Sequence, residues 1–358
     1  MKRIIIGILT LVFAISMVIF GIGCKAEAVE EEAAVEEAPA EEEAAVPAEE
    51  VEYKIVFYFP NIHPYYEAVT KGLEKFEEDY GIHIDFVYGT GWTQDISNEN
   101  IESLVADGYQ GICDGPFDAN ACNLLYEEIV KQGVFVTTFG SVPNTPTPAS
   151  FGFATDIKGA AMQAAEIVIK QMGEKGNILN VLEVMEDPNT ILRKEGVEEV
   201  VAKYPDVQII QEVAGMSTIE ESLEKVEAAL SARVEEIDGI ITTGYTPSVA
   251  VATILTDMEN DRIAFCGIDD DPDLLEAIKS GYASATIAQN PYGQGYLGSL
   301  SLKLLIDGYK TKEDFTFVNS SLVVVTKENA DTYIDDLWDV TLGIADKFAD
   351  TYFVAPES

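Results

Sequence analysis

Residues 265–273 read Phe-Cys-Gly-Ile-Asp-Asp-Asp-Pro-Asp, and residues 280–295 read Ser-Gly-Tyr-Ala-Ser-Ala-Thr-Ile-Ala-Gln-Asn-Pro-Tyr-Gly-Gln-Gly. The runs 264–268 and 283–288 are short and apolar, which is typical of buried parallel strands. Asp269 and Gln289 follow these strands at their carboxyl ends, where open α/β sheets bind ligands. A carboxylate that accepts hydrogen bonds beside an amide that both donates and accepts suits a neutral, polyhydroxylated ligand.

The rest of the chain after residue 53 repeats this alternation of strand and helix patterns. The expected strands are short apolar runs at 54–59, 83–88, 109–113, 134–138, 178–184, 207–211, 239–243 and 263–268. Amphipathic stretches lie between them, such as Val69, Leu73, Phe76 and Tyr80 at helical spacing before Gly81, a C-terminal cap. The pattern predicts doubly wound parallel sheets, and roughly three hundred residues exceed one core, so we expect two α/β lobes.

The first 23 residues predict an export signal. A charged start at residues 1–3 precedes the apolar run 4–22, and Cys24 follows a glycine. A signal that ends in cysteine is typical of bacterial lipoproteins, so we expect Cys24 to be acylated and to anchor the mature chain. Gly21 stands where such signals usually have leucine, and a retained membrane span is the alternative. Both interpretations place the remaining chain outside the cytoplasm, in the periplasm or on the outer face of the membrane.

Residues 24–52 are mostly Ala and Glu, with few large apolar groups. Like charges repel and no core can form, so this segment is expected to be an extended tether. The whole chain has a net charge of −41, which argues against nucleic acid or an anionic lipid surface as a partner.

The remaining cysteines and histidines indicate neither a metal site nor a cofactor site. Cys113 and Cys122 are each compatible with a disulfide or with buried free thiols, and the sequence leaves this open. The two histidines have no zinc-ligand spacing with cysteine. The acidic run 269–273 lacks the ligand spacing of an EF-hand, and Asp271 or Asp273 is expected to cap the next helix. Hydrolase, Walker and zinc-protease motifs are missing from the sequence, so we expect a protein that is not an enzyme.

Two motifs resemble the ribose-binding-protein-like, type I periplasmic solute-binding proteins of ABC transporters. Gly267-Ile268-Asp269 stands where that family has Gly-Phe-Asp, and Thr286-Ile287-Ala288-Gln289 where it has Thr-Ile-Ala-Gln. The resemblance extends over about residues 53–334 and implies two lobes joined by a hinge of three crossings, near Asp156, Gln289 and Asn319. The implied boundaries are 53–155 plus 290–318 for the N-terminal lobe, 156–289 plus 319–345 for the C-terminal lobe, and 346–358 for a tail. Composition alone divides the chain once, near Asp156.

The resemblance also implies ligand-binding residues. His63, Tyr65 and Tyr66 match a family motif with an asparagine before the proline and two aromatic residues after it. The aromatic pair offers flat faces for a sugar ring, although one tyrosine could be a core residue and His63 a helix cap. Arg193 matches an arginine whose paired donors suit neighbouring hydroxyls, the alternative being a surface residue. Met216 aligns with an aromatic residue of the family and implies a softer apolar wall.

Two departures from ribose-binding proteins concern the expected ligand. Phe139-Gly140-Ser141 replaces an Asp-Arg pair, and Gly244-Tyr245-Thr246 replaces Asn-Asp. Phe139 and Tyr245 are therefore expected to contact a different ligand. Losing a buried hydrogen bond costs about 1–3 kcal/mol, so these changes argue against ribose itself.

The sequence thus predicts a lipid-anchored extracytoplasmic receptor that captures a sugar or polyol by hinge closure and delivers it to an ABC transporter permease. We expect a monomer that neither forms nor breaks covalent bonds in its ligand. The alternatives are a purine-nucleoside receptor, a sensory module for a membrane receptor, and an extracytoplasmic hydrolase.

Overall fold

The computed structural model describes residues 51–185 and 187–357. The expected export signal, Cys24 and most of the acidic tether lie outside the described residues. Within the described part, no helix combines the length and the apolar character that a membrane span requires.

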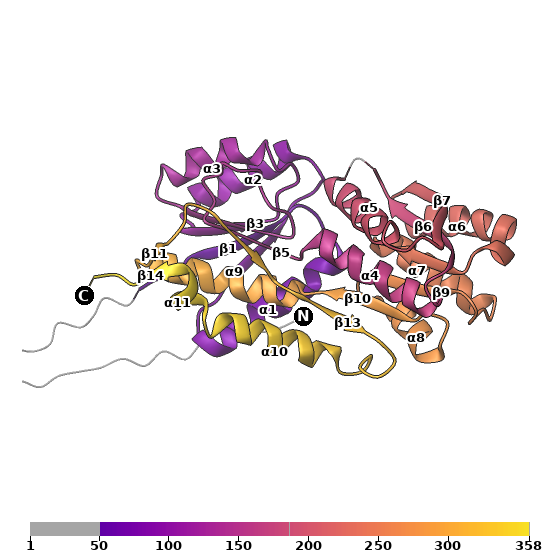
Figure 1. The fold of residues 1–358 in the computed structure, drawn as a ribbon. Helices are drawn as coiled ribbons and strands as arrows, with labels where there is room; N and C mark the ends of the chain where they lie inside the picture. Colours follow the sequence, from indigo (N-terminus) through magenta and orange to yellow (C-terminus); the bar gives the residue numbers. More distant parts are fainter. Residues whose placement is uncertain (1–50, 186, 358) are drawn as a thin grey trace, which may run out of the picture. The chain divides into compact units, whose positions relative to one another are not determined.

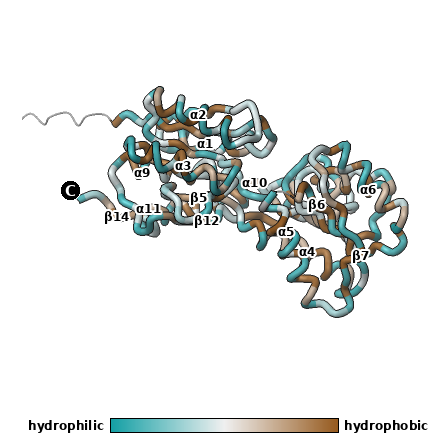
Figure 2. Tube along the Cα trace, turned by 90° about the horizontal axis from the view of Figure 1, so that it is seen from above, coloured by the Kyte–Doolittle hydropathy of each residue, from teal (hydrophilic) through white to brown (hydrophobic). Residues whose placement is uncertain are grey.

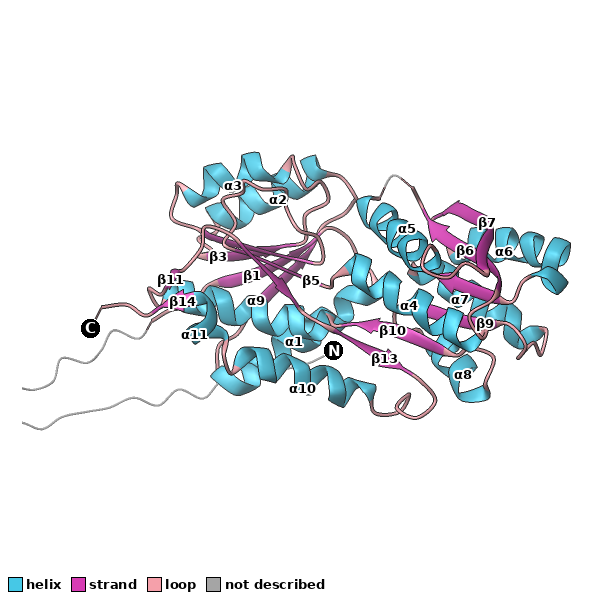
Figure 3. Ribbon diagram, in the orientation of Figure 1, coloured by secondary structure: helices cyan, strands magenta, loops and turns pink. Residues whose placement is uncertain are grey.

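The described chain forms two α/β lobes, each built on a six-stranded sheet, which confirms the predicted fold class (Figure 1, Figure 3). The strands are β1 (Ile55–Phe59), β2 (Asp85–Tyr88), β3 (Gly111–Asp114), β4 (Phe135–Phe139), β5 (Phe151–Ala154), β6 (Gly176–Glu183), β7 (Val207–Met216), β8 (Gly239–Thr242), β9 (Ala264–Ile268), β10 (Ala285–Gln289), β11 (Lys310–Thr311), β12 (Thr316–Asn319), β13 (Leu322–Val325) and β14 (Phe353–Val354). The helices are α1 (Pro64–Tyr80), α2 (Gln94–Ala106), α3 (Cys122–Val130), α4 (Ile157–Gln171), α5 (Pro188–Val201), α6 (Ile219–Arg233), α7 (Tyr245–Asp257), α8 (Pro272–Ser280), α9 (Pro291–Ile306), α10 (Tyr333–Ala345) and α11 (Phe348–Tyr352), with a 3-10 turn, η1 (Val234–Glu236).

The first lobe has the strand order β12-β5-β4-β3-β1-β2, all parallel. The second has the order β13-β10-β9-β8-β6-β7, parallel except for the antiparallel pair β10 and β13. The sequence patterns predict β1–β4 and β6–β10, and they miss β5 and β11–β14. Hydrophobic and hydrophilic segments alternate along the trace of both lobes (Figure 2), as expected when strands are buried on both faces by helices.

Helix α1 illustrates how local sequence sets an element near the cavity. His63 is its N-cap, a proline occupies the first turn, and Gly81 ends it with φ of 67°. Its partner α9 approaches so closely that a Cβ on Gly295 would lie 2.3 Å from the Val69 carbonyl oxygen. Glycine at this crossing therefore fixes the position of α1 against the first sheet.

The chain passes between the sheets in three places. Residues 155–156 link β5 to α4, Asn290 links β10 to α9, and residues 320–321 link β12 to β13. Asn290 is fully buried, and its side-chain Nδ2 donates to the Ser320 carbonyl at 2.8 Å and to the Thr341 hydroxyl at 2.9 Å. Two of the crossings are thus hydrogen-bonded to each other and to α10.

The C-terminal residues differ from the expected tail. Residues 346–357 contain α11 and β14. Strand β14 pairs with β11, the strand that follows α9. Phe348 and Phe353 are buried in the aromatic core around Phe151. These apolar side chains explain why the segment packs onto the first lobe rather than extending into solvent.

Cys113, Cys122 and Cys266 are free and buried in the described part of the chain. Burial raises the pKa of Cys122 to about 12, so the thiol stays protonated at neutral pH. The question that the sequence left open is therefore answered in favour of buried free thiols.

Candidate functional site

A cavity of about 710 Å³ opens between the carboxyl ends of the strands of the two sheets. All the ligand-binding residues expected from the sequence except Met216 line it: His63, Tyr65, Tyr66, Phe139, Arg193, Tyr245, Asp269 and Gln289. The volume is in the range of small-molecule sites. Strand ends of both lobes thus bring together side chains that are far apart in the sequence.

The first lobe contributes an aromatic wall. The Tyr66 ring stacks on Phe59 with centroids 5.0 Å apart and an interplanar angle of 3°, and it meets Phe139 edge-on at 5.8 Å. The Tyr65 hydroxyl donates to Gln294 Oε1 at 2.9 Å, and this oxygen also accepts from the Gly140 backbone N–H. Desolvation raises the pKa of both tyrosines above its ordinary value, so each hydroxyl remains a neutral donor.

His63 has one of the roles considered from the sequence, that of a helix cap. Its Nδ1 accepts from the Tyr65 backbone N–H at 3.2 Å, which makes it the cap of α1. Its ring also lies 5.9 Å from the Tyr245 ring of the second lobe, centroid to centroid. Burial lowers the pKa of His63, so the imidazole is neutral at pH 7. His63 therefore both orders the helix start and contacts the opposite lobe beside the cavity.

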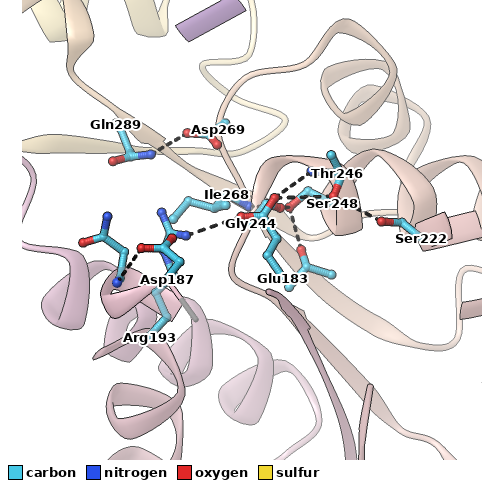
Figure 4. Close-up of polar contacts among 12 residues, drawn as sticks. Glu183, Asp187, Arg193, Ser222, Gly244, Thr246, Ser248, Ile268, Asp269 and Gln289 are labelled. Atoms are coloured by element: carbon cyan, nitrogen blue, oxygen red, sulfur yellow. Dashed lines mark hydrogen bonds and ion pairs between the residues drawn. The ribbon is translucent and has the colours of Figure 1, made fainter. Parts of the chain in front are cut away.

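Arg193 projects from α5 into the cavity and is only 7% exposed. Its NH1 lies 3.7 Å from Glu183 Oε2 (Figure 4), a carboxylate that also accepts from the Thr246 backbone N–H. The Arg193 Nε has no hydrogen-bond partner among the described residues. An unpaired buried donor costs about 1–3 kcal/mol.

Asp269 directly follows β9, and its backbone has the left-handed conformation, with φ of 67°. Its backbone N–H and C=O are held by Ile287 and Thr286 of the neighbouring strand, and its Oδ1 accepts from Gln289 Nε2 at 2.7 Å (Figure 4). Burial raises the pKa of Asp269 to about 6, while the Gln289 hydrogen bond and the Arg193 charge oppose that shift. The carboxylate is ionised at pH 7 and retains capacity to accept further hydrogen bonds.

The neighbouring aspartates have structural partners. Asp271 caps α8 by accepting from the Asp273 N–H, and its other oxygen accepts from the Tyr245 hydroxyl at 2.6 Å. Asp270 accepts from the Tyr333 hydroxyl of α10 at 2.8 Å. The acidic run after β9 is thus divided between one cavity residue, one contact to α10 and one helix cap.

The expected role of Met216 is wrong. Met216 ends β7, is fully buried, and belongs to the hydrophobic core of the second lobe. Successive side chains along a strand point to opposite faces, and the one at position 216 points into the core. The alignment of a motif fixes the strand end but not the direction of this side chain.

Sequence reasoning missed several residues that line the cavity. They are Pro60, Trp92, Gly115, Pro116, Phe117, Asp118, Ala119, Asn120, Ser141, Asn144, Ile157, Glu183, Val184, Asp187 and Asn189. Their shared signal is position: most follow β2, β3, β4 or β6 directly, at the same sheet edges as the predicted residues. Among these lining residues Arg193 is the single arginine or lysine, whereas Asp118, Glu183, Asp187 and Asp269 are acidic.

Comparisons with known proteins agree with this geometry. The periplasmic binding protein domain matches residues 54–310. A xylitol-binding protein of Mycolicibacterium smegmatis is 24% identical over 71% of this chain and 72% of its own length, and the D-allose-binding periplasmic protein of Escherichia coli is 20% identical over 73% and 88%.

Solved structures show the same fold. An ABC transporter solute-binding protein from Burkholderia graminis, in complex with D-arabinose, superposes with a TM-score of 0.70 at 22% identity and covers 79% of this chain and 98% of its own. One from Actinobacillus succinogenes with bound D-allose gives 0.72 at 19% identity over 78% and 100%. The chain thus has two sheets joined by three crossings, a cavity at their strand ends, and a domain match over most of its length. We conclude that this chain belongs to the periplasmic binding protein domain family, whose members bind solutes and are not enzymes.

Proposed function

We propose that this protein is an extracytoplasmic receptor that captures a neutral sugar or polyol between its two lobes and delivers it, as a monomer, to the permease of an ABC importer. The observation that carries the proposal is the composition of the cavity. The aromatic wall of the first lobe faces the Arg193, Asp269 and Gln289 side chains of the second. A sugar ring has apolar C–H faces and polar hydroxyl edges, and this cavity offers a surface for each.

The charges of the lining favour a neutral ligand over an anionic one. The one guanidinium is already 3.7 Å from Glu183, and Asp118, Asp187 and Asp269 add negative charge. A sugar acid would bring a further carboxylate into this field, at a cost that Arg193 alone does not offset. Hydroxyl groups can donate to Asp269 and accept from Arg193 without any net charge.

The relatives support the same ligand class. The curated relatives are named for xylitol and D-allose, and the superposed structures hold D-arabinose and D-allose. Ribose remains disfavoured, because Phe139-Gly140-Ser141 and Gly244-Tyr245-Thr246 stand where ribose-binding proteins have polar side chains. We expect binding by hinge closure, since only a closed form lets both lobes contact one ligand, and ligand then shifts the population toward that form.

The first test is thermal unfolding with a panel of pentoses, hexoses, polyols, inositols and nucleosides. A ligand at a thousand times its dissociation constant adds about 4 kcal/mol, which raises the midpoint by about 10 °C for a chain of this size. A shift with one neutral sugar or polyol supports the proposal, and a shift with sugar acids alone contradicts it. Selective response to nucleosides would establish the purine-nucleoside alternative, for which the many aromatic side chains of the lining are the favouring observation.

Attachment to the membrane through acylated Cys24 is part of the proposal and rests on the sequence of residues 1–24. Expression of the full chain and of Cys24→Ala, followed by detergent phase separation, tests it. We expect the unchanged chain in the detergent phase and the variant in the aqueous phase. Equal partitioning of the two proteins would contradict lipid attachment.

A further inference from the structure

The cavity is wider than one sugar ring requires. Its lining in the first lobe follows β4, β3, β1 and β2, which are neighbours in that order, and in the second lobe it follows β10, β9, β8 and β6. Three intervals between strands span about 14 Å. A six-membered ring with its hydroxyls, built from bonds of about 1.5 Å, is roughly 6–7 Å across. The strands whose ends carry the lining therefore span about twice the width of one ring in each sheet.

Exposure differs among the side chains that line this cavity. Phe139 is fully buried and Gln289 is 9% exposed. Trp92, in the loop after β2, is 43% exposed and Phe117, in the loop after β3, is 54% exposed, although both line the cavity. Large aromatic faces left open to water inside a cavity are surfaces that a ligand can cover.

The loops that carry Trp92 and Phe117 are joined by a hydrogen bond. The Asp118 backbone N–H donates to the side-chain Oε1 of Gln94 at 2.9 Å, which joins the residue after Phe117 to the start of α2, two positions after Trp92. The Trp92 ring lies 6.4 Å from His63 and 6.4 Å from Tyr66, centroid to centroid, so it continues the aromatic wall. We call Trp92 and Phe117 the outer wall.

Building on the proposed function, we propose that the natural ligand is a sugar joined to a second ring, and that the outer wall holds this second ring while Arg193, Asp269 and Gln289 bind the first. The second ring needs an apolar face for stacking, which the second unit of a disaccharide and the base of a nucleoside both supply. A free monosaccharide would leave Trp92 and Phe117 exposed to water.

The test is calorimetric titration of the full chain with matched one-ring and two-ring compounds: D-xylose with xylobiose, D-galactose with lactose, and D-ribose with adenosine. We expect the two-ring compound of at least one pair to bind about tenfold more tightly or better, the size of one aromatic contact. The pair that responds distinguishes a disaccharide from a nucleoside.

The variants Trp92→Ala and Phe117→Ala should weaken binding of the two-ring compound at least about tenfold more than binding of its one-ring partner, which removes the advantage. Leu124→Ala is the matched control, because Leu124 is 71% exposed but lies outside the cavity lining. Unchanged unfolding midpoints of the ligand-free variants would show that the fold is intact. In a contrary result, the one-ring sugar of every pair binds as tightly as its two-ring partner, and Trp92→Ala has no effect. This result would overturn the proposed role of the outer wall and leave the proposed function standing. If no compound of any pair binds while a sugar or polyol of the wider panel does, the outer wall fails and the proposed function stands.

Fluorescence gives an independent readout, because the chain contains two tryptophans, Trp92 and Trp338. Trp338 packs on Tyr292 and Tyr296 outside the cavity lining, so Trp338→Phe leaves Trp92 as the reporter. In this variant we expect the two-ring ligand to protect Trp92 from acrylamide quenching. Unchanged quenching at saturation would contradict stacking on Trp92.

Discussion

Asp269 shows at the level of a single side chain how burial couples binding to pH. Its pKa of about 6 lies above the ordinary value of about 3.9, so the ligand-free protein takes up a proton on folding between these values and becomes less stable as the pH rises through that window. A hydroxyl that donates to the carboxylate favours the ionised form. We therefore predict that ligand affinity is constant above pH 7 and falls by up to about tenfold per pH unit below 6, as titration calorimetry between pH 5 and 8 would show. Asp269→Asn is the control, with weaker binding at pH 7 and a flatter profile. An unchanged profile in that variant would assign the pH dependence to another group, such as His63.

The crossing of α1 and α9 shows how a helix pair positions the cavity wall. A Cβ on Gly295 would lie 2.3 Å from a backbone oxygen of α1, whereas a Cβ on Gly343 in α10 would meet no atom within 4 Å. Gly295→Ala should separate α1 from α9, lower the free energy of unfolding by about 1–3 kcal/mol and weaken ligand binding through Tyr65. Gly343→Ala, the same change in an exposed helix, should raise the free energy of unfolding by about 0.5–1 kcal/mol. Urea unfolding of both variants tests whether the free energy of unfolding changes in opposite directions. Equal changes in the two variants would contradict the packing argument.

The charge of the whole molecule makes a prediction about salt. The chain has 63 acidic and 22 basic residues, and several ion pairs among the described residues are exposed, such as Lys71 with Glu74. Exposed pairs contribute little, so repulsion among carboxylates dominates and is screened by added ions. We predict that the unfolding midpoint at about pH 7.5 rises as sodium chloride increases from about 10 mM to about 200 mM, because the Debye length falls over this range from about 30 Å to below about 10 Å. An equal osmolality of an uncharged solute is the control, and a midpoint that falls with salt would show that the ion pairs outweigh the repulsion.

The local pattern of the sequence was sufficient for the alternation of strands and helices, the Gly81 cap and the placement of Asp269 and Gln289 at strand ends. Short apolar runs and turn residues act over a few positions, and the carboxyl ends of parallel strands share one edge. Resemblance to a family supplied His63, Tyr65, Tyr66 and Arg193, each of which lines the cavity. For these features no long-range contact had to be known.

Other features depend on contacts between distant segments. The direction of Met216 into a core, the packing of residues 346–358 on the first lobe, and the positions of Trp92 and Phe117 at one cavity follow from how whole elements pack. A side chain on a strand changes faces with a shift of one residue, and a loop side chain has no periodic pattern at all. The tertiary structure alone therefore decided which residues form the cavity's outer wall, because packing between elements, rather than local propensity, sets those directions.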